Sequence, residues 1–353
     1  MSDSKVRVLV VDDSAFMRIA VKRTLESHPK IEVVGQAKDG AEAVQKVKEL
    51  RPDVVTMDFN MPRMNGVEAI RAIFADEPVP ILMLSAHTQE GAQETLDALA
   101  AGAVDFIPKP DGEVSTDLSG VKEELFRKIR AASRSKPAVA KALASGPTRE
   151  RAPAPTQRAT PRPSARGDFP VVVIAVSTGG PAALERVVPR LPADFPGAVL
   201  VVQHMPKAFT RALAKRLDGI SGLEVREAVA GDALEPGTVY VAPGDRHLVF
   251  DAAGRIKLTE TPPVHGCRPS ADVTLQAAAR GLGKRITVVV MTGMGKDGAL
   301  GSQAIKAAGG KVLAQDQASS VVYGMPKAVV DLGLADAVVP LEGLAAKIVE
   351  TAG

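Results

Sequence analysis

Three polar residues in the C-terminal half, Ser177, His204 and Asp297, have the side chains needed for nucleophilic hydrolysis. A serine hydroxyl can attack a carbonyl, and an imidazole can take the hydroxyl proton and return it to the leaving group. A carboxylate can fix the tautomer of that imidazole. Because such triads are recognised by geometry, any chain order is compatible with this chemistry. The three residues are candidates for one site if the fold brings them together.

Ser177 lies at a turn between a strand and a helix. The run Val171–Val176 is apolar and mostly β-branched, which predicts a strand buried on both faces. Gly179 and Gly180 follow, and Pro181 suits the first turn of a helix. This is the layout of a nucleophile elbow, and equally that of a phosphate-binding turn. The turn alone leaves both interpretations open, beside that of a plain buried turn.

The neighbouring strands favour the nucleophile. His204 directly follows the predicted strand Ala198–Gln203, and Asp297 lies in a glycine-rich loop after the predicted strand Ile286–Met291. The carboxyl ends of parallel strands meet at one edge of a sheet, so we expect Ser177, His204 and Asp297 there. A phosphate-binding P-loop would also need a lysine after its glycines, which this turn lacks.

Other residues compete for these roles. His247 and His265 are also in loops, and Asp272 could be the carboxylate, although it fits better as a first-turn helix acid. His28 lies in the other half of the chain, and Cys267 follows no predicted strand. No two of these histidines have the spacing of zinc ligands, so we expect no cofactor in the catalytic half.

A second polar group lies at strand ends in the N-terminal half: Asp12, Asp13, Asp58, Ser85 and Lys109. Three converging carboxylates repel one another, and a hard cation such as Mg²⁺ would neutralise them. A carboxylate beside Mg²⁺ and a lysine can act as a nucleophile toward a phosphoryl group. Lys109 and the Ser85 hydroxyl would then bind the added phosphoryl oxygens.

Two α/β domains must position these groups. Five strands alternate with helices up to a last helix over Leu118–Arg130, which predicts a doubly wound parallel sheet. A second, mostly parallel sheet follows, with a small antiparallel insert near residues 223–260. Between them, residues 132–168 are rich in Pro, Ala, Arg and Ser, which is typical of a flexible linker. We therefore predict domains over 1–131 and 169–353.

The composition narrows the class of protein. The chain has 353 residues, 45% hydrophobic and 24% charged, which is ordinary for a globular protein of about two domains. Its single cysteine excludes an intramolecular disulfide, and no apolar run is long enough to span a membrane. We expect a cytoplasmic protein without membrane insertion. A net charge of +3 says little about nucleic acid, and 3% aromatic residues argue against stacking platforms for single strands. We expect no nucleic-acid partner.

The N-terminal segment resembles the receiver domain of bacterial response regulators, a flavodoxin-like fold. The resemblance rests on Asp12-Asp13, on Asp58 in the pattern Asp-x-Asn-Met-Pro, and on Ser85 and the proline-flanked Lys109. It implies that a chemotaxis histidine kinase phosphorylates Asp58.

The same resemblance implies which residues bind the metal. Asp12, Asp13, Asp58 and the Asn60 carbonyl would surround Mg²⁺. Phe106 matches the aromatic switch position of this family.

The C-terminal segment resembles the effector domain of the chemotaxis protein-glutamate methylesterase, a Rossmann-like hydrolytic domain. The matching motifs are Val176–Pro181, Gln203–Pro206, Ala242–Gly244, Arg268–Ser270 and Met291–Gly298. The sequence departs from the family at Ala175, where a glycine-rich approach to the serine is usual, and in its long linker.

This resemblance implies a phosphorylation-activated serine hydrolase that demethylates glutamate methyl esters on methyl-accepting chemoreceptors and also deamidates receptor glutamines. Ser177, His204 and Asp297 match its catalytic positions, and Thr178 and Met294 match residues of its oxyanion site. Two alternatives remain: the same triad acting on another ester or amide, and a second domain that only binds, for example to DNA. No helix-turn-helix pattern or basic stripe supports the latter.

Overall fold

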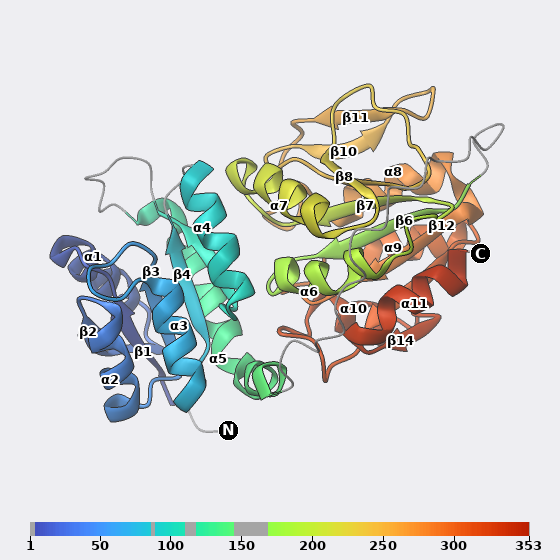
Figure 1. The fold of residues 1–353 in the computed structure, drawn as a ribbon. Coiled ribbons are helices and arrows are strands. Elements are labelled where there is room, and N and C mark those ends of the chain that lie inside the picture. The colour runs from blue at the N-terminus through green and yellow to red at the C-terminus, as the bar shows by residue number, and fades with distance from the viewer. Residues whose placement is uncertain (1–3, 86–88, 110–117, 145–168, 353) are drawn as a thin grey trace. The chain divides into compact units, whose positions relative to one another are not determined.

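A parallel sheet of five strands, in the order β2-β1-β3-β4-β5, forms the centre of the N-terminal part of the chain (Figure 1). Its strands alternate with helices as predicted, and their side chains are largely buried. The elements are β1 (Val6–Val11), α1 (Ala15–Glu26), β2 (Ile31–Ala37), α2 (Gly40–Leu50), β3 (Val54–Asp58), α3 (Gly66–Asp76), β4 (Ile81–Ser85), α4 (Gln89–Ala100), β5 (Asp105–Pro108), η1 (Ser119–Val121) and α5 (Lys122–Ala144).

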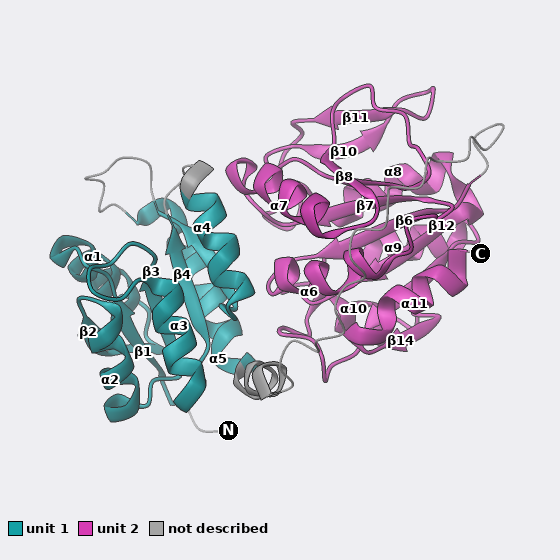
Figure 2. Ribbon diagram, in the orientation of Figure 1, with its two compact units in different colours: residues 1–147 teal, residues 148–353 magenta. Residues whose placement is uncertain are grey.

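The computed structural model describes residues 4–85, 89–109, 118–144 and 169–352. It divides the chain into two units, residues 1–147 and 148–353 (Figure 2). In these described ranges, no helix combines the length and the apolar character that crossing a membrane requires.

Helix α5 is longer than the sequence analysis predicted. It continues to Ala144, so the first part of the expected linker, residues 132–144, is helical. Alanine and lysine are frequent there and favour helix, which outweighs the presence of Pro137. The remainder of the predicted linker, residues 145–168, lies outside the described residues.

The second unit contains a sheet of seven strands, all parallel, in the order β14-β13-β12-β6-β7-β9-β8. The prediction of two doubly wound α/β domains is thus confirmed. The elements are β6 (Val171–Val176), α6 (Gly180–Val187), η2 (Val188–Arg190), β7 (Ala198–Gln203), α7 (Lys207–Ile220), β8 (Glu224–Glu227), β9 (Thr238–Val241), β10 (His247–Phe250), β11 (Ile256–Thr259), α8 (Ala271–Gly281), η3 (Gly283–Arg285), β12 (Ile286–Val290), α9 (Ala299–Ala307), β13 (Lys311–Gln315), α10 (Met325–Asp331), β14 (Ala337–Val339) and α11 (Leu341–Ala352).

The antiparallel insert is smaller than predicted. Only β10 and β11 pair antiparallel, whereas β8 and β9 join the parallel sheet at one edge. Strand β14, which the sequence analysis missed, extends the opposite edge. With only three residues and none of them fully buried, it gives little periodic signal.

The strand order places the candidate residues at one point of this sheet. Central strand β6 has β7 on one side and β12 on the other, so the chain reverses its direction of winding next to β6. In open α/β sheets ligands bind beyond the carboxyl ends of the strands at such a switch point. Ser177 follows β6, His204 follows β7, and Asp297 lies in the loop after β12.

Candidate active site

The turn after β6 fixes the position of Ser177. The Ser177 N–H donates to the Thr292 carbonyl at 3.0 Å, and the Ser177 carbonyl accepts from the N–H of Gly180 at 2.8 Å. Gly179 adopts a left-handed conformation with φ of 78°, and a Cβ there would lie 2.7 Å from Val321. The glycine after Thr178 is therefore required by both backbone conformation and space.

Gln203 connects the backbone of the serine to that of the histidine. Its side-chain Nε2 donates to the carbonyls of Ser177 and His204, each at 3.1 Å, and the residue is 2% exposed. From the sequence, no separate role was predicted for Gln203. Its place before His204 at a strand end was the available signal.

His204 and Asp297 form a hydrogen-bonded pair. The Nε2 atom of His204 lies 2.7 Å from Oδ2 of Asp297, and both side chains are largely buried. The His204 backbone N–H donates to the Val176 carbonyl at 3.2 Å, which fixes the loop beside β6. The structure thus brings together the imidazole and the carboxylate that the strand-end argument singled out.

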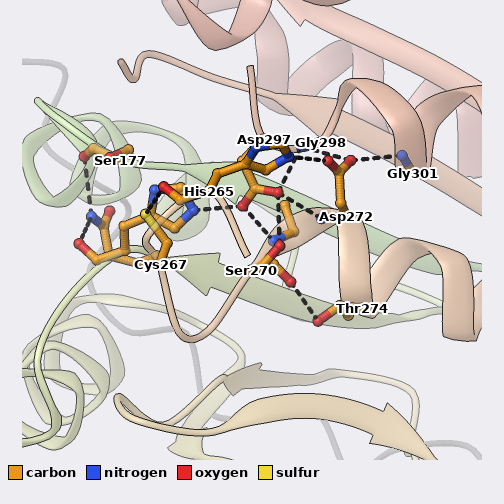
Figure 3. A network of polar contacts seen from close by, with 12 residues as sticks. Ser177, His265, Cys267, Ser270, Asp272, Thr274, Asp297, Gly298 and Gly301 are labelled. Atoms are coloured by element: carbon orange, nitrogen blue, oxygen red, sulfur yellow. Dashed lines mark hydrogen bonds and ion pairs between the residues drawn. The ribbon is translucent and has the colours of Figure 1, made fainter. Parts of the chain in front are cut away.

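Asp297 is held by four further donors, three from the start of helix α8 and one from its own loop (Figure 3). Oδ1 accepts from the Ser270 hydroxyl at 2.8 Å, from the Asp272 N–H at 2.9 Å and from the Gly298 N–H at 3.1 Å. Oδ2 accepts from the Ala271 N–H at 2.7 Å. Two of these N–H groups open helix α8, whose dipole also favours an anion.

The electrostatics of the pair favour its charged form. Burial opposes ionisation of Asp297, but hydrogen bonding and charge from His204 outweigh it and lower the Asp297 pKa to about 2. Burial also opposes a charged His204, but the hydrogen bonds of Asp297 and Cys267 raise the His204 pKa to about 9. At neutral pH the imidazole is therefore mainly protonated at rest.

The competing histidines make other contacts. His247 is fully buried, with its ring nitrogens 3.2 Å from the Pro262 carbonyl and from the Ser270 N–H. Burial lowers the His247 pKa, which suits a neutral structural residue. His28 packs edge-on against Phe126 in the first unit. Neither histidine contacts Asp297 through its ring.

His265 forms a second pair with Asp272, at 2.9 Å. Asp272 lies in the first turn of α8, as predicted, and also accepts from the N–H groups of Gly298 at 3.0 Å and Gly301 at 2.7 Å. Its carboxylate is thus used to join α8 to the loop that carries Asp297 (Figure 3).

The loop after β12 comes very close to Ser177. A Cβ on Gly293 would lie 2.8 Å from the Ser177 Cβ, so only glycine fits. Met294 follows and is half-buried, and Thr178 is buried with its carbonyl accepting from Thr292 Oγ1 at 2.8 Å. Thr178 and Met294 thus border the serine, and their oxyanion role stays a prediction.

The polar group of the first unit also converges. The Nζ atom of Lys109 lies 3.0 Å from Asp12 Oδ2 and 2.8 Å from Asp58 Oδ1. Carboxylate oxygens of Asp12, Asp13 and Asp58 all lie within 4.8 Å of one another. Burial raises the pKa of Asp58 to about 6, and Asp12 adds to the rise while Lys109 opposes it. This excess of negative charge and the all-oxygen donor set fit a hard divalent cation.

Two further predicted residues border this group. Ser85 is buried at the end of β4, and its hydroxyl donates to the Gly91 carbonyl at 3.2 Å and accepts from Thr95. Asn60 is exposed, and its amide donates to a Glu94 carboxylate oxygen at 3.2 Å. Ser85 would have to turn from Gly91 to bind a phosphoryl oxygen.

Among the described residues, one other group has the composition of a metal site. Ligand atoms of His265, Asp272 and Asp297 lie within 4.8 Å of one another. Both carboxylates, however, are already bonded by backbone N–H groups, and the imidazole is bonded to Asp272. We assign these residues to the hydrogen-bond network.

Each of the two units matches a known protein family. Residues 8–115 match the response regulator receiver domain, and residues 172–348 match the CheB methylesterase family. The chain is therefore a response regulator whose receiver precedes a methylesterase domain.

Similarity extends over nearly the whole chain. A protein-glutamate methylesterase/protein-glutamine glutaminase of Symbiobacterium thermophilum is 48% identical, over 99% of this chain and 97% of the relative. A protein of the same name from Pyrococcus horikoshii is 46% identical, over 98% of this chain and 93% of the relative. The crystal structure of the Thermotoga maritima CheB methylesterase catalytic domain is 44% identical, with a TM-score of 0.51, and covers 52% of this chain and 99% of that domain. The chain belongs to the protein-glutamate methylesterase/protein-glutamine glutaminase family, a family of hydrolases.

Proposed function

We propose that the second unit hydrolyses glutamate methyl esters of chemoreceptors with Ser177 as nucleophile, and that phosphorylation of the receiver activates it. The observation that carries the proposal is the bonded pair of His204 and Asp297 at the sheet's switch point, beside the turn that presents Ser177. Substrate class comes from the names of the relatives.

The hydrogen bond between His204 and Asp297 indicates which atoms take part in each step of the reaction. Oγ of Ser177 attacks the ester carbonyl carbon while His204 takes the hydroxyl proton. Because Nε2 is bonded to Asp297, Nδ1 is the nitrogen that accepts this proton. The tetrahedral intermediate then expels methoxide, which takes the proton from His204 and leaves as methanol, giving a glutamyl ester of Ser177.

Water completes the cycle. His204 takes a proton from a water molecule, which attacks the carbonyl carbon of the Ser177 ester. The bond from this carbon to Oγ then breaks, His204 returns the proton to Oγ of Ser177, and the glutamate carboxyl group is released. Backbone N–H groups near Thr178 and Met294 would stabilise the negative oxygen, each donor contributing on the order of 10²–10³ in rate. An amide carbonyl can follow the same route with ammonia as leaving group, which accounts for glutamine deamidation.

In the first unit, Asp58 is the proposed phosphoryl acceptor from a chemotaxis histidine kinase. Asp12, Asp13, Asp58 and the Asn60 carbonyl would hold Mg²⁺, which supplies positive charge to the phosphoryl group when bound. Lys109 lies between Asp12 and Asp58 and can bind a phosphoryl oxygen by a short movement. Ser85 would bind another.

The test is methanol release from methyl-labelled chemoreceptor membranes, with and without a small-molecule phosphodonor and Mg²⁺. We expect release from the unmodified protein, more release with the phosphodonor, and none from a folded Ser177→Ala variant. Asp58→Asn should keep the basal rate and lose the response. Release by Ser177→Ala would reject this nucleophile.

The same experiment separates the alternatives. No release from a folded protein that still takes up phosphate would reject the chemoreceptor esters and leave another ester or amide, or a binding output. A response that persists in Asp58→Asn would place the control site elsewhere.

A further inference from the structure

Thr292 connects three segments at the carboxyl edge of the seven-stranded sheet. It lies just after β12, and its side chain is fully buried. Its hydroxyl donates to the Thr178 carbonyl at 2.8 Å and accepts from the Val322 N–H at 3.0 Å. Its carbonyl accepts from the Ser177 N–H at 3.0 Å, and its N–H donates to Oε1 of Gln315 at 2.8 Å. The polar groups of Thr292 therefore join the loop after β12 to the chain at the ends of β6 and β13.

The turn that presents Ser177 is of a kind that has two common forms. The Ser177 carbonyl accepts from the Gly180 N–H at 2.8 Å, so Thr178 and Gly179 are the two central residues of a β-turn. Gly179 has φ of 78° and ψ of 0°, the values of the third position in a type II turn. Thr178 is not among the residues with positive φ, which excludes a type I′ turn. A type I turn would differ mainly in the peptide between Thr178 and Gly179, which would be turned over.

The hydroxyl of Thr292 distinguishes these two forms. The carbonyl to which it donates belongs to the peptide that would turn over, so this hydrogen bond is made only in the type II form. The Val322 N–H occupies a lone pair of the same hydroxyl and leaves the hydroxyl proton for a carbonyl. The Val322 carbonyl is a second acceptor, but it lies 3.4 Å away, compared with 2.8 Å for that of Thr178. The shorter of the two bonds therefore holds the type II form.

The orientation of this peptide matters for hydrolysis because turning it over exchanges a donor for an acceptor. In a trans peptide the N–H and the C=O point in opposite directions, so the bond to Thr292 directs the Gly179 N–H away from Thr292. Among the described residues, this N–H has no hydrogen-bond partner. In the turned-over form the Thr178 carbonyl would take its place. A negative oxygen that forms near Ser177 is stabilised by N–H donors and repelled by a carbonyl.

We propose that Thr292 is a positioning residue for hydrolysis, whose hydroxyl keeps the turn after Ser177 in the form that presents a donor. The inference rests on the proposed function of Ser177 as nucleophile. Thr292 acts through the peptide between Thr178 and Gly179 and not on the substrate. Thr292→Val removes the hydroxyl with little change of shape, and it leaves the Thr178 carbonyl and the Val322 N–H without this partner. Thr292→Ser keeps the hydroxyl and is the conservative variant.

The first experiment measures how fast Ser177 reacts with a fluorophosphonate in the full-length protein. Oγ of Ser177 displaces fluoride from phosphorus, and intact mass follows the adduct, so no receptor substrate is needed. We expect Thr292→Val to lower the second-order rate constant at least about tenfold, because loss of one oxyanion donor costs on the order of 10²–10³ in rate. Thr292→Ser, which retains the donor, should stay within about threefold. A folded Thr292→Val that reacts as fast as the unmodified protein overturns the proposal.

Thr274→Val is the matched control. Thr274 is also fully buried in the second unit, and its hydroxyl donates to the Leu248 carbonyl at 2.9 Å. This variant should lower the urea midpoint as Thr292→Val does, while its labelling rate stays within about threefold of the unmodified protein. An equal loss of rate in Thr274→Val would reduce the effect of Thr292 to general stability and overturn the proposal.

A second substitution covers the case in which Thr292→Val does not fold. Thr292→Cys retains only a weak donor, so its labelling rate should fall below that of Thr292→Ser. A rate equal to that of the unmodified protein overturns the proposal.

Steady-state methanol release from methyl-labelled chemoreceptor membranes then separates kcat from KM. Thr292→Val should lower kcat at least about tenfold and leave KM within about threefold, because the donor acts on charge that develops after binding. A rise of KM with unchanged kcat would assign Thr292 to substrate binding and overturn the proposal. Labelling without methanol release rejects the chemoreceptor esters but still tests Thr292. Absence of both rejects Ser177 as the nucleophile, and this inference with it.

Discussion

Replacing Asp297 by asparagine changes one oxygen of the site into an NH₂ group, and we expect this change to lower both activity and stability. Oδ2 of Asp297 accepts from His204 Nε2 and from the Ala271 N–H, and Oδ1 accepts from Ser270, Asp272 and Gly298. An amide has only one oxygen, so its NH₂ group must face one of these two sets of donors. His204 and Ala271 form the smaller set, so we expect the NH₂ group of the asparagine to face these two donors.

The catalytic consequence follows from the tautomer. An asparagine NH₂ facing His204 donates to Nε2, which moves the ring proton to Nδ1. A protonated Nδ1 cannot accept the proton of Ser177. The comparable exchange in a serine protease lowers kcat by about 10⁴ through the wrong tautomer, and we expect a loss of kcat/KM on this order for Asp297→Asn.

The same substitution should also lower the free energy of unfolding, by a few kcal/mol. The Ala271 N–H is left facing another donor, and the ion pair with His204 is lost. An orphaned buried donor costs roughly 1–3 kcal/mol. The fall of the Asp297 pKa from 3.8 to about 2 corresponds to about 2 kcal/mol for the ion pair. The larger shift of His204 describes the same pair but also includes Cys267, so it is not added. We expect a destabilisation of about 3–5 kcal/mol.

The assay compares Asp297→Asn with Asp272→Asn. Asp272 is equally buried and accepts from Gly298, Gly301 and His265, but it does not contact His204. Both variants should unfold at lower urea concentration, whereas only Asp297→Asn should lose about 10⁴ in kcat/KM. The reasoning is refuted if Asp297→Asn retains a tenth of the activity. It is equally refuted if a folded Asp272→Asn loses as much as Asp297→Asn.

Three further outcomes are expected. Gln203→Leu removes the donor shared by the Ser177 and His204 carbonyls, so kcat should fall at least tenfold with KM less affected, in steady-state kinetics. Gly179→Ala should lower the free energy of unfolding by more than 1 kcal/mol in urea titrations, because φ there is 78° and the added Cβ clashes. The raised His204 pKa stabilises the fold fully below pH 6.5, and this contribution of about 3 kcal/mol disappears as pH rises to about 9. The gap in unfolding free energy between the unmodified protein and His204→Gln should narrow over that range, and a gap that widens would contradict the sign.

Short-range patterns are enough to locate the strand ends that carry the candidate residues. Val171–Val176 and Ala198–Gln203 are continuous apolar runs, and the structure has strands over the same residues. Parallel strands then place whatever follows them at one edge, so Ser177 and His204 could be brought together from the sequence. The placement of Asp297 in the loop after β12 followed in the same way.

The partners of these residues could not be predicted in this way. Ser270 donates to Asp297 across 27 positions in the sequence, and Thr292 accepts from Ser177 across more than a hundred. No periodicity links such pairs. For Gln203, burial and two carbonyl partners become visible only when the loops after β6 and β7 lie side by side.

The predicted start of the linker at residue 132 is wrong for a different reason. Residues 132–144 contain the alanine and lysine of a helix together with Pro137, but they were assigned to the linker with the whole stretch 132–168, which is rich in Pro, Ala, Arg and Ser. A single breaking residue costs a few kcal/mol, which a long helix joined to a packed segment can absorb. Composition alone therefore places such a boundary poorly.

The site has one property that neither patterning nor the fold explains. Asp297 must orient His204, but the same carboxylate favours the imidazolium, which cannot act as a base. Burial of the imidazole opposes this effect but does not cancel it, because the pKa of His204 is raised overall. The carboxylate that orients the base therefore also limits the fraction of His204 that is neutral and able to accept a proton at pH 7.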